Sequence, residues 1–163
     1  MWRLMATGNL SSPVCDEPKP LAGRRSPTSA VDLKHGEEVP VRVLVVDDHP
    51  AFRKALSSAL NLVADIEVAG EAGGGMAACE EAEQLHPDII IMDLSMPDLS
   101  GIDAMKRIHE QHPELPVVIL TAHADEGVER EAREAGASGF VAKGTGLSDL
   151  VIVLHEAAEP DEV

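Results

Sequence analysis

The sequence has few cysteines and no long hydrophobic run, and each shortage excludes a class of protein. Cys15 and Cys79 are its only cysteines, and their separation matches neither a disulfide framework nor a metal-ligand spacing. We expect both to be free thiols in a reducing compartment. No stretch approaches the roughly 18 apolar residues that a membrane span needs, and residues 1–5 do not begin a signal peptide. These absences predict a cytoplasmic protein without a membrane segment.

Basic residues are scarce compared with acidic ones. The chain of 163 residues has 13 Lys or Arg and 29 Asp or Glu, which gives a formal net charge of −16. Residues 1–40 carry five of each sign, so the acidic excess lies entirely in residues 41–163. Nucleic acids and anionic membrane surfaces bind proteins mainly through Lys and Arg. The composition therefore argues against direct binding of nucleic acid.

The first 40 residues differ in composition from the rest. They hold five of the eleven prolines, many small polar residues and no apolar periodicity, which is typical of a segment that does not order itself. We interpret residues 1–40 as a disordered leader, or alternatively as sequence added by a misassigned start codon. We expect residues 41–158 to form one domain and residues 159–163 an acidic tail, in line with the usual size of domains.

Residues 41–158 alternate between strand-like and helix-like patterns. Five apolar or β-branched runs predict strands, and the segments between them, with apolar residues at helical spacing, predict helices. Such alternation predicts a parallel sheet covered by helices on both faces, a doubly wound α/β domain. The predicted strands are 41–46, 66–69, 88–92, 116–120 and 138–142. The predicted helices are the segments that begin at Pro50 and Met76, the one that carries Ile102, Met105 and Ile108, and residues 125–135 and 147–158.

Polar side chains follow four of the predicted strands. Asp47 and Asp48 follow the first, and Asp93, Thr121 and Lys143 follow the third, fourth and fifth. Ligand sites in parallel sheets form at the carboxyl ends of the strands, so we expect these side chains to converge. Three neighbouring carboxylates repel one another without a cation, and Mg²⁺ prefers such oxygen ligands. Each residue alone is more often a cap, a turn or a surface charge, but the whole set indicates a functional site.

The segments around these positions resemble the receiver domain of bacterial two-component response regulators, over residues 41–158. The Asp-Asp-His-Pro run and the absence of a proline after Lys143 are similar to receivers of the NarL/FixJ type. The resemblance implies a flavodoxin-like (βα)5 fold with strand order 2-1-3-4-5. The segments that carry it are Val45–Pro50, Ile91–Gly101, Leu120–Ala122 and Gly139–Lys143.

The resemblance also implies a chemistry. Asp93 would accept a phosphoryl group from a histidine kinase or a phosphotransfer protein, and Lys143 would pair with a phosphate oxygen while the Thr121 hydroxyl contributes a further contact. Mg²⁺ would be held by Asp47, Asp48, Asp93 and the backbone carbonyl of Ser95. Positioning and charge neutralisation are what phosphoryl transfer requires. Such a domain catalyses only its own phosphorylation and dephosphorylation and is not otherwise an enzyme.

The same resemblance implies a switch and an output surface. Thr121 would move toward phosphorylated Asp93, and Phe140 would turn inward in response. Because Phe140 has no hydroxyl, its inward and outward positions would differ in packing and not in a hydrogen bond. The alternative is that Phe140 is a fixed core residue. Output would use the surface of residues 125–135, 138–142 and 147–158, which would bind a downstream protein or a second copy of the chain.

The C-terminal end, Ser95, the glycines and two histidines also bear on the function of the protein. The chain ends at Val163 without room for a DNA-binding domain, so we expect a stand-alone receiver, with a receiver fragment of a DNA-binding transcription regulator as the alternative. A Mg²⁺-dependent aspartyl-phosphate phosphohydrolase is less favoured, because such enzymes commonly need an acid where Ser95 stands. The glycines of residues 70–75 lack a phosphate-loop pattern. His49 and His123 are expected to lie at the rim of the site and to modulate dephosphorylation.

Overall fold

A computed structural model of the protein describes residues 39–159. The leader predicted for residues 1–40 and the tail predicted for residues 159–163 therefore lie almost wholly outside the described residues, as does Cys15. Within the described part, Cys79 is a free thiol. The fold expected from the sequence can be compared with the structure over all of residues 41–158.

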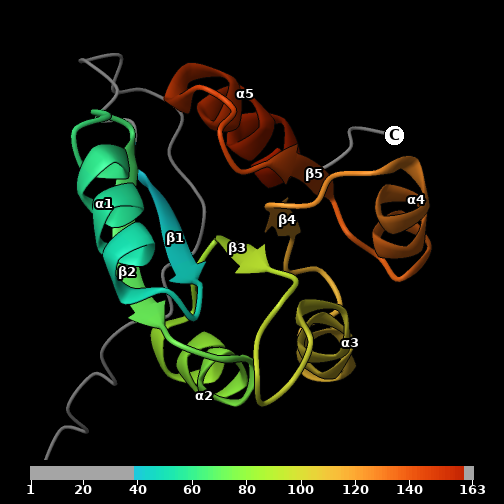
Figure 1. The fold of residues 1–163 in the computed structure, drawn as a ribbon. Helices are drawn as coiled ribbons and strands as arrows, with labels where there is room; N and C mark the ends of the chain where they lie inside the picture. Colours follow the sequence, from blue (N-terminus) through green and yellow to red (C-terminus); the bar gives the residue numbers. More distant parts are fainter. Residues whose placement is uncertain (1–38, 160–163) are drawn as a thin grey trace, which may run out of the picture. The chain divides into compact units, whose positions relative to one another are not determined.

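Five strands and five helices alternate along the described chain, as Figure 1 shows. The strands form one parallel sheet in the order β2-β1-β3-β4-β5, which confirms the predicted flavodoxin-like topology. In chain order the elements are β1 (Val41–Val46), α1 (Pro50–Leu60), β2 (Ile66–Ala72), α2 (Gly75–Leu85), β3 (Ile89–Asp93), α3 (Gly101–Gln111), β4 (Val117–Thr121), α4 (Glu126–Glu134), β5 (Gly139–Ala142) and α5 (Leu147–Ala158).

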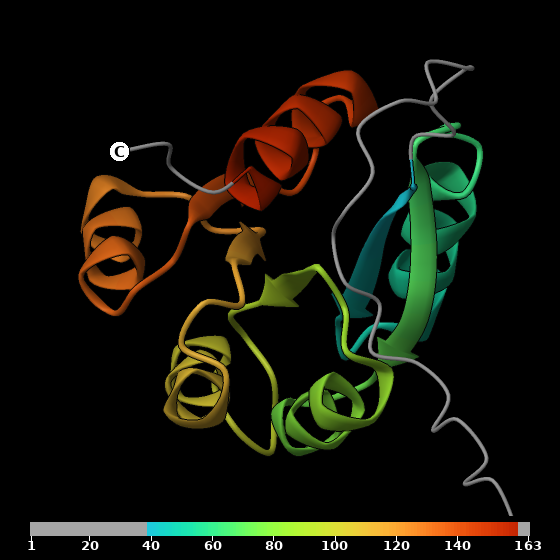
Figure 2. The same ribbon diagram turned by 180° about the vertical axis from the view of Figure 1, so that it is seen from behind.

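The two faces of the sheet have separate hydrophobic cores. Successive side chains of a strand point to opposite faces, and both faces are covered, so the buried stretches of the central strands are continuously apolar: Val43–Val46, Ile89–Met92 and Val117–Leu120. In β1, Leu44 and Val46 pack with α2, α3 and α4, whereas Val43 and Val45 pack with α1 and α5. Figures 1 and 2 show the same division, with α1 and α5 on one side of the sheet and the other three helices on the opposite side. This burial fixes the register of every strand.

The structure differs from the sequence prediction mainly at β2. The prediction ended this strand at Ala69, but β2 continues to Ala72. The pairing with β1 skips one residue opposite Val43 and Leu44, which forms a bulge, and then continues to the pair of Val46 and Ala72. Gly70 and Glu71 suggest a turn locally, but backbone pairing with a neighbouring strand outweighs that preference. The result carries β2 to the edge of the sheet where β1 ends.

Helix boundaries follow local chemistry. Pro50 begins α1, where its missing N–H and fixed φ are tolerated. The side chain of Asp125 accepts hydrogen bonds from the N–H groups of Gly127 and Val128 at 2.9 and 3.0 Å and caps α4. Gly136 has a φ of 108°, a conformation that favours glycine, and it directly follows the predicted helix range of residues 125–135. Both ends of α4 are therefore determined by its own sequence.

Candidate functional site

The carboxyl ends of β1, β3, β4 and β5 bring acidic and basic side chains together. Lys143, the residue after β5, places Nζ 2.5 Å from Asp47 Oδ2 and 3.3 Å from Asp93 Oδ1. Asp47 follows β1 and Asp93 ends β3, and these two strands are neighbours in the sheet. The ammonium group thus joins residues that are far apart in the sequence.

Two of the three carboxylates at this edge of the sheet are almost fully buried. Asp47 is 2% exposed and Asp93 is 4% exposed, whereas the side chain of Asp48 is 25% exposed. Burial raises the pKa of Asp93, Lys143 opposes that rise, and the charges of Asp47 and Asp48 add to it. With all three carboxylates ionised, one ammonium leaves an excess of two negative charges. The donor set therefore fits a divalent cation held by hard oxygen ligands.

Lys143 is held charged by its surroundings. Burial alone would lower the pKa of its ammonium, but the hydrogen bond to Asp47 and the charges of Asp93 and Asp47 outweigh burial and raise the pKa. The ring of Phe52 in α1 lies beneath the ammonium, with the ring centroid 4.6 Å from Nζ. Phe52 is not among the site residues predicted from the sequence. Its place in the helix that follows Asp47 and Asp48 is the one local signal for it.

Thr121 ends β4 next to Lys143. It is 2% exposed, its backbone oxygen accepts a hydrogen bond from the N–H of Lys143 at 2.7 Å, and its Oγ1 accepts one from the N–H of His123 at 3.2 Å. The pairing of Asp93 with Leu120 sets Thr121 at the same edge of the sheet as Asp93. His123 is exposed, at the rim where the sequence analysis expected it.

Phe140 lies on β5, opposite Ile119 of β4. The ring is partly buried and packs against the core beneath α2, α3 and α4. It lies three residues before Lys143, which directly follows the end of β5. This placement is compatible both with a movable ring and with a fixed core residue.

The loop after Asp93 is tied to two neighbouring elements. Ser95 is exposed in this loop, two residues after Asp93. Gly101 closes the loop by donating its N–H to the oxygen of Leu94 at 3.0 Å, and an added Cβ there would collide with the backbone of Asp93. Asp98 accepts hydrogen bonds from the first N–H groups of α2 at 3.0 and 3.1 Å, which lowers its pKa. Sequence reasoning missed Asp98, whose partners are 22 and 23 residues away.

His49 lies against the two adjacent aspartates. Its Nδ1 is 2.9 Å from Asp48 Oδ1 and 3.5 Å from Asp47 Oδ1. Among the residues that the structure describes, Asp47, Asp48 and His49 form the one group of three potential metal ligands whose donor atoms all lie within 4.8 Å of one another. The sequence analysis placed His49 at the rim, and the structure puts it in direct contact with the carboxylates.

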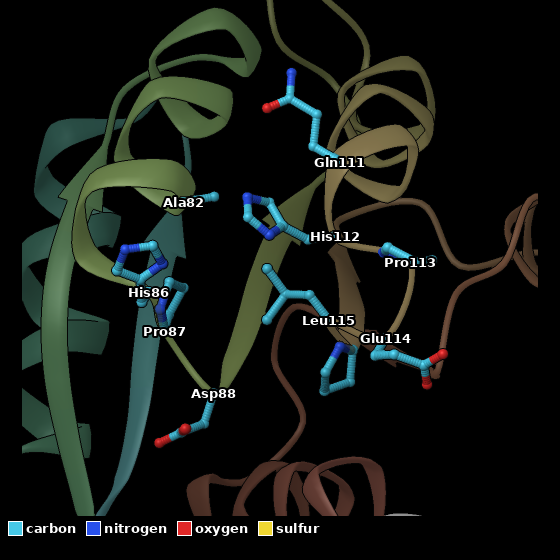
Figure 3. Close-up of a pocket in the computed structure, with 10 residues that line it drawn as sticks. Ala82, His86, Pro87, Asp88, Gln111, His112, Pro113, Glu114 and Leu115 are labelled. Atoms are coloured by element: carbon cyan, nitrogen blue, oxygen red, sulfur yellow. The ribbon is translucent and has the colours of Figure 1, made fainter. Parts of the chain in front are cut away.

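A pocket of about 470 Å³ lies at the opposite edge of the sheet, before β3 and β4 begin. Figure 3 shows His86 and His112 facing this pocket, with ring centroids 6.5 Å apart. The acidic residues at the carboxyl ends of the strands do not line it. Its remaining lining residues are Ala82, Pro87, Asp88, Gln111, Pro113, Glu114, Leu115 and Pro116.

Comparison with known proteins gives one consistent family. The sequence profile of the response regulator receiver domain matches residues 43–155. The response regulator protein VraR of Staphylococcus saprophyticus is 34% identical over 125 residues, which cover 77% of this chain and 60% of that protein. The response regulator GacA of Pseudomonas viridiflava is 34% identical over 111 residues, covering 68% and 52% respectively. The chain thus spans only about half to three fifths of the length of these relatives.

Solved structures agree with the sequence matches. The signal receiver domain of the response regulator NarL from Mycobacterium tuberculosis superposes with a TM-score of 0.70 at 32% identity, covering 74% of this chain and 97% of that one. The response regulator domain of Thermotoga maritima CheB gives a TM-score of 0.69 at 34% identity, covering 75% and 98%. None of the helices in residues 39–159 is long and apolar enough to cross a membrane. The fold, the acidic group at the ends of the strands and these matches together show that the chain belongs to the response regulator receiver domain family of two-component systems.

Proposed function

We propose that the protein is a phosphorylation-dependent switch in which Asp93 accepts a phosphoryl group from a histidine kinase or a phosphotransfer protein. The observation that carries this proposal is the contact of Lys143 with Asp93 and Asp47 at the ends of three strands. A carboxylate oxygen of Asp93 attacks phosphorus, the bond between phosphorus and the donor breaks, and an acyl phosphate forms. The leaving group departs with the bonding electrons. The domain acts in this step only on itself.

The charges around Asp93 support this chemistry. Asp47, Asp48, Asp93 and the backbone carbonyl of Ser95 would hold Mg²⁺, which supplies positive charge to the transferring oxygens. The ammonium of Lys143 is already 3.3 Å from Asp93 Oδ1, so it can pair with a phosphate oxygen without a large movement. Asp93 is almost fully buried, which limits the access of bulk water to its carboxylate. The excess negative charge also explains why a cation would be required before a phosphate enters.

The change of state would pass through Thr121 and Phe140. Phosphorylation adds charge and strong acceptor oxygens next to the Thr121 hydroxyl, which would move toward them. Phe140, on the neighbouring strand, would then shift its packing against the core beneath α4. The partner would read the change at the surface of α4, β5 and α5. This surface includes Leu147 and Ile152 of α5, which are 36% and 54% exposed.

The output partner is proposed to be a downstream protein or a second copy of the chain, in the cytoplasm. On α4, Arg133 is paired with Glu129 of the same helix at 2.9 Å, so these two charges are satisfied within one copy. Apolar contacts of α5 therefore offer more to a partner than the ion pairs of α4 do. A second candidate is a receiver that controls a DNA-binding domain of a longer regulator, because the matched relatives extend well beyond the aligned part.

Intact mass spectrometry tests the proposal directly. The protein is incubated with acetyl phosphate and Mg²⁺, and we expect a gain of about 80 Da for one phosphoryl group. The gain should be absent in EDTA and in Asp93→Asn, while Asp103→Asn, on the exposed first turn of α3, should behave as the wild type. Phosphorylation that persists in Asp93→Asn would assign the acceptor to another residue. If acetyl phosphate gives no gain of mass, the same variants are compared with a purified histidine kinase as the phosphoryl donor.

A further inference from the structure

We propose that His49 is a nitrogen ligand of the divalent-cation site, so that this site binds Zn²⁺ and similar transition-metal ions through imidazole as well as Mg²⁺ through oxygen. The inference rests on the proposed cation site of Asp47 and Asp48 and extends it to a different class of ion. It makes the receiver responsive to the metal that occupies it.

The separations of the donor atoms match those around a metal ion. Bonds of about 2.1 Å from zinc to nitrogen or oxygen place neighbouring ligand atoms about 3.0 Å apart in an octahedron and about 3.4 Å apart in a tetrahedron. Nδ1 of His49 lies 2.9 Å from Asp48 Oδ1 and 3.5 Å from Asp47 Oδ1. All three donor atoms lie within 4.8 Å of one another, so small shifts of these side chains would let one ion contact all of them.

The local backbone holds the imidazole in this position. His49 is the N-cap residue of α1 with an extended conformation, φ −91° and ψ 104°, but its side chain makes no capping hydrogen bond. Its own N–H donates to Asp47 Oδ1 at 2.8 Å, which folds residues 47–49 into a tight turn. Pro50 follows at the start of α1 and fixes the direction of the chain. The side chain is thus directed at the carboxylates and is not used to cap the helix.

The contact between His49 and Asp48 involves an oxygen that has no other partner among the described residues. Asp48 Oδ1 is shielded from solvent and receives no well-aligned hydrogen bond from residues 39–159. Its neighbour at 2.9 Å is Nδ1 of His49, and two lone pairs at that distance repel each other. Either the Nδ1–H of the imidazole points at this oxygen, or a metal ion lies between the two atoms and His49 is its ligand.

The chemistry of the imidazole determines which ions His49 binds. Imidazole suits zinc, nickel, copper and iron, whereas Mg²⁺ is bound mainly by carboxylate, carbonyl and water oxygens. Removal of His49 should therefore weaken transition-metal binding selectively. We expect His49→Ala to lower the affinity for Zn²⁺ by at least about tenfold and to change the affinity for Mg²⁺ by no more than about twofold.

The test is a titration of the full chain with Zn²⁺ and with Mg²⁺. Calorimetry measures the affinity for each ion, and ¹⁵N NMR of the imidazole nitrogens shows which histidine binds it. Zn²⁺ should shift the Nδ1 signal of His49, identified by its loss in His49→Ala, whereas Mg²⁺ should shift amides of residues 47–48 without shifting any imidazole nitrogen. His123→Ala, exposed at the same edge of the sheet, is the matched control. The double variant His86→Ala/His112→Ala removes the pair of histidines in the pocket of Figure 3, whose own Zn²⁺ binding would otherwise be confused with this site.

The outcomes separate this inference from the proposed function. An unshifted His49 Nδ1 with saturating Zn²⁺, or equal Zn²⁺ affinity of wild type and His49→Ala, overturns the role of His49 while Mg²⁺ binding leaves the switch intact. Zn²⁺ binding lost only in the His86/His112 variant overturns it as well. If Asp47→Asn abolishes the binding of both ions, the shared site is supported. If neither ion binds the wild type and no phosphoryl group is gained, the cation site itself is refuted.

Discussion

Replacement of Lys143 by methionine should destabilise the fold because it leaves two buried carboxylates without their cation. The ammonium lies 2.5 Å from Asp47 and 3.3 Å from Asp93, which at an effective dielectric constant of about 20 gives a gross attraction on the order of 10 kcal/mol. Desolvation offsets most of this. Breaking comparable buried pairs costs about 3–5 kcal/mol, and since the side chain of Lys143 is 15% exposed, we expect about 3 kcal/mol.

Urea denaturation at pH 7 in EDTA measures this loss. With a slope of about 1.5–2 kcal/mol per molar, the midpoint should fall by roughly 1.5–2 M. Mg²⁺ should stabilise Lys143→Met more than wild type, because the ion then neutralises charge that the ammonium no longer does. Lys54→Met, on the exposed side of α1, is the control and should shift the midpoint little. A loss below about 0.5 kcal/mol for Lys143→Met, the range of ordinary surface substitutions, would refute the argument from buried charge.

Three other changes test neighbouring contacts. Asp93→Asn should raise the free energy of unfolding at neutral pH in EDTA. The pKa of Asp93 in the folded protein is raised above 3.8, so the ionised carboxylate destabilises the fold once the pH has risen through that folded pKa. This destabilisation should disappear as the pH falls toward 3.8. Urea melts at several pH values check this, and a gain that grows at low pH would contradict it. Asp98→Ala should speed amide exchange at Met76 by removing the acceptor for the first turn of α2, and an unchanged exchange rate would show that the contact does not hold this turn. Phe52→Leu should slow phosphorylation by acetyl phosphate roughly 2- to 5-fold, equivalent to about 0.5–1 kcal/mol of lost contact with Lys143. An unchanged rate would mean that the ring does not position the ammonium.

The sequence by itself determined the alternation of strands and helices and the edge of the sheet where the site lies. The part of a strand that is covered on both faces needs apolar side chains in succession, so β1, β3 and β4 are visible as short runs of apolar residues. The polar residue that ends each run is visible for the same reason. Parallel topology then requires all these ends to meet at one edge, and Asp47, Asp93 and Lys143 do meet there.

Only the tertiary structure decided which of these groups touch and what supports them. The continuation of β2 to Ala72 depends on pairing with β1 across a bulge. The capping of α2 by Asp98 and the packing of Phe52 against Lys143 join segments separated by 22 and 91 positions in the numbering. The spacing of apolar residues shows which face of a single helix or strand is buried. Contacts between two elements depend instead on the distance and direction between them. That geometry exists only once the sheet and its helices have packed together.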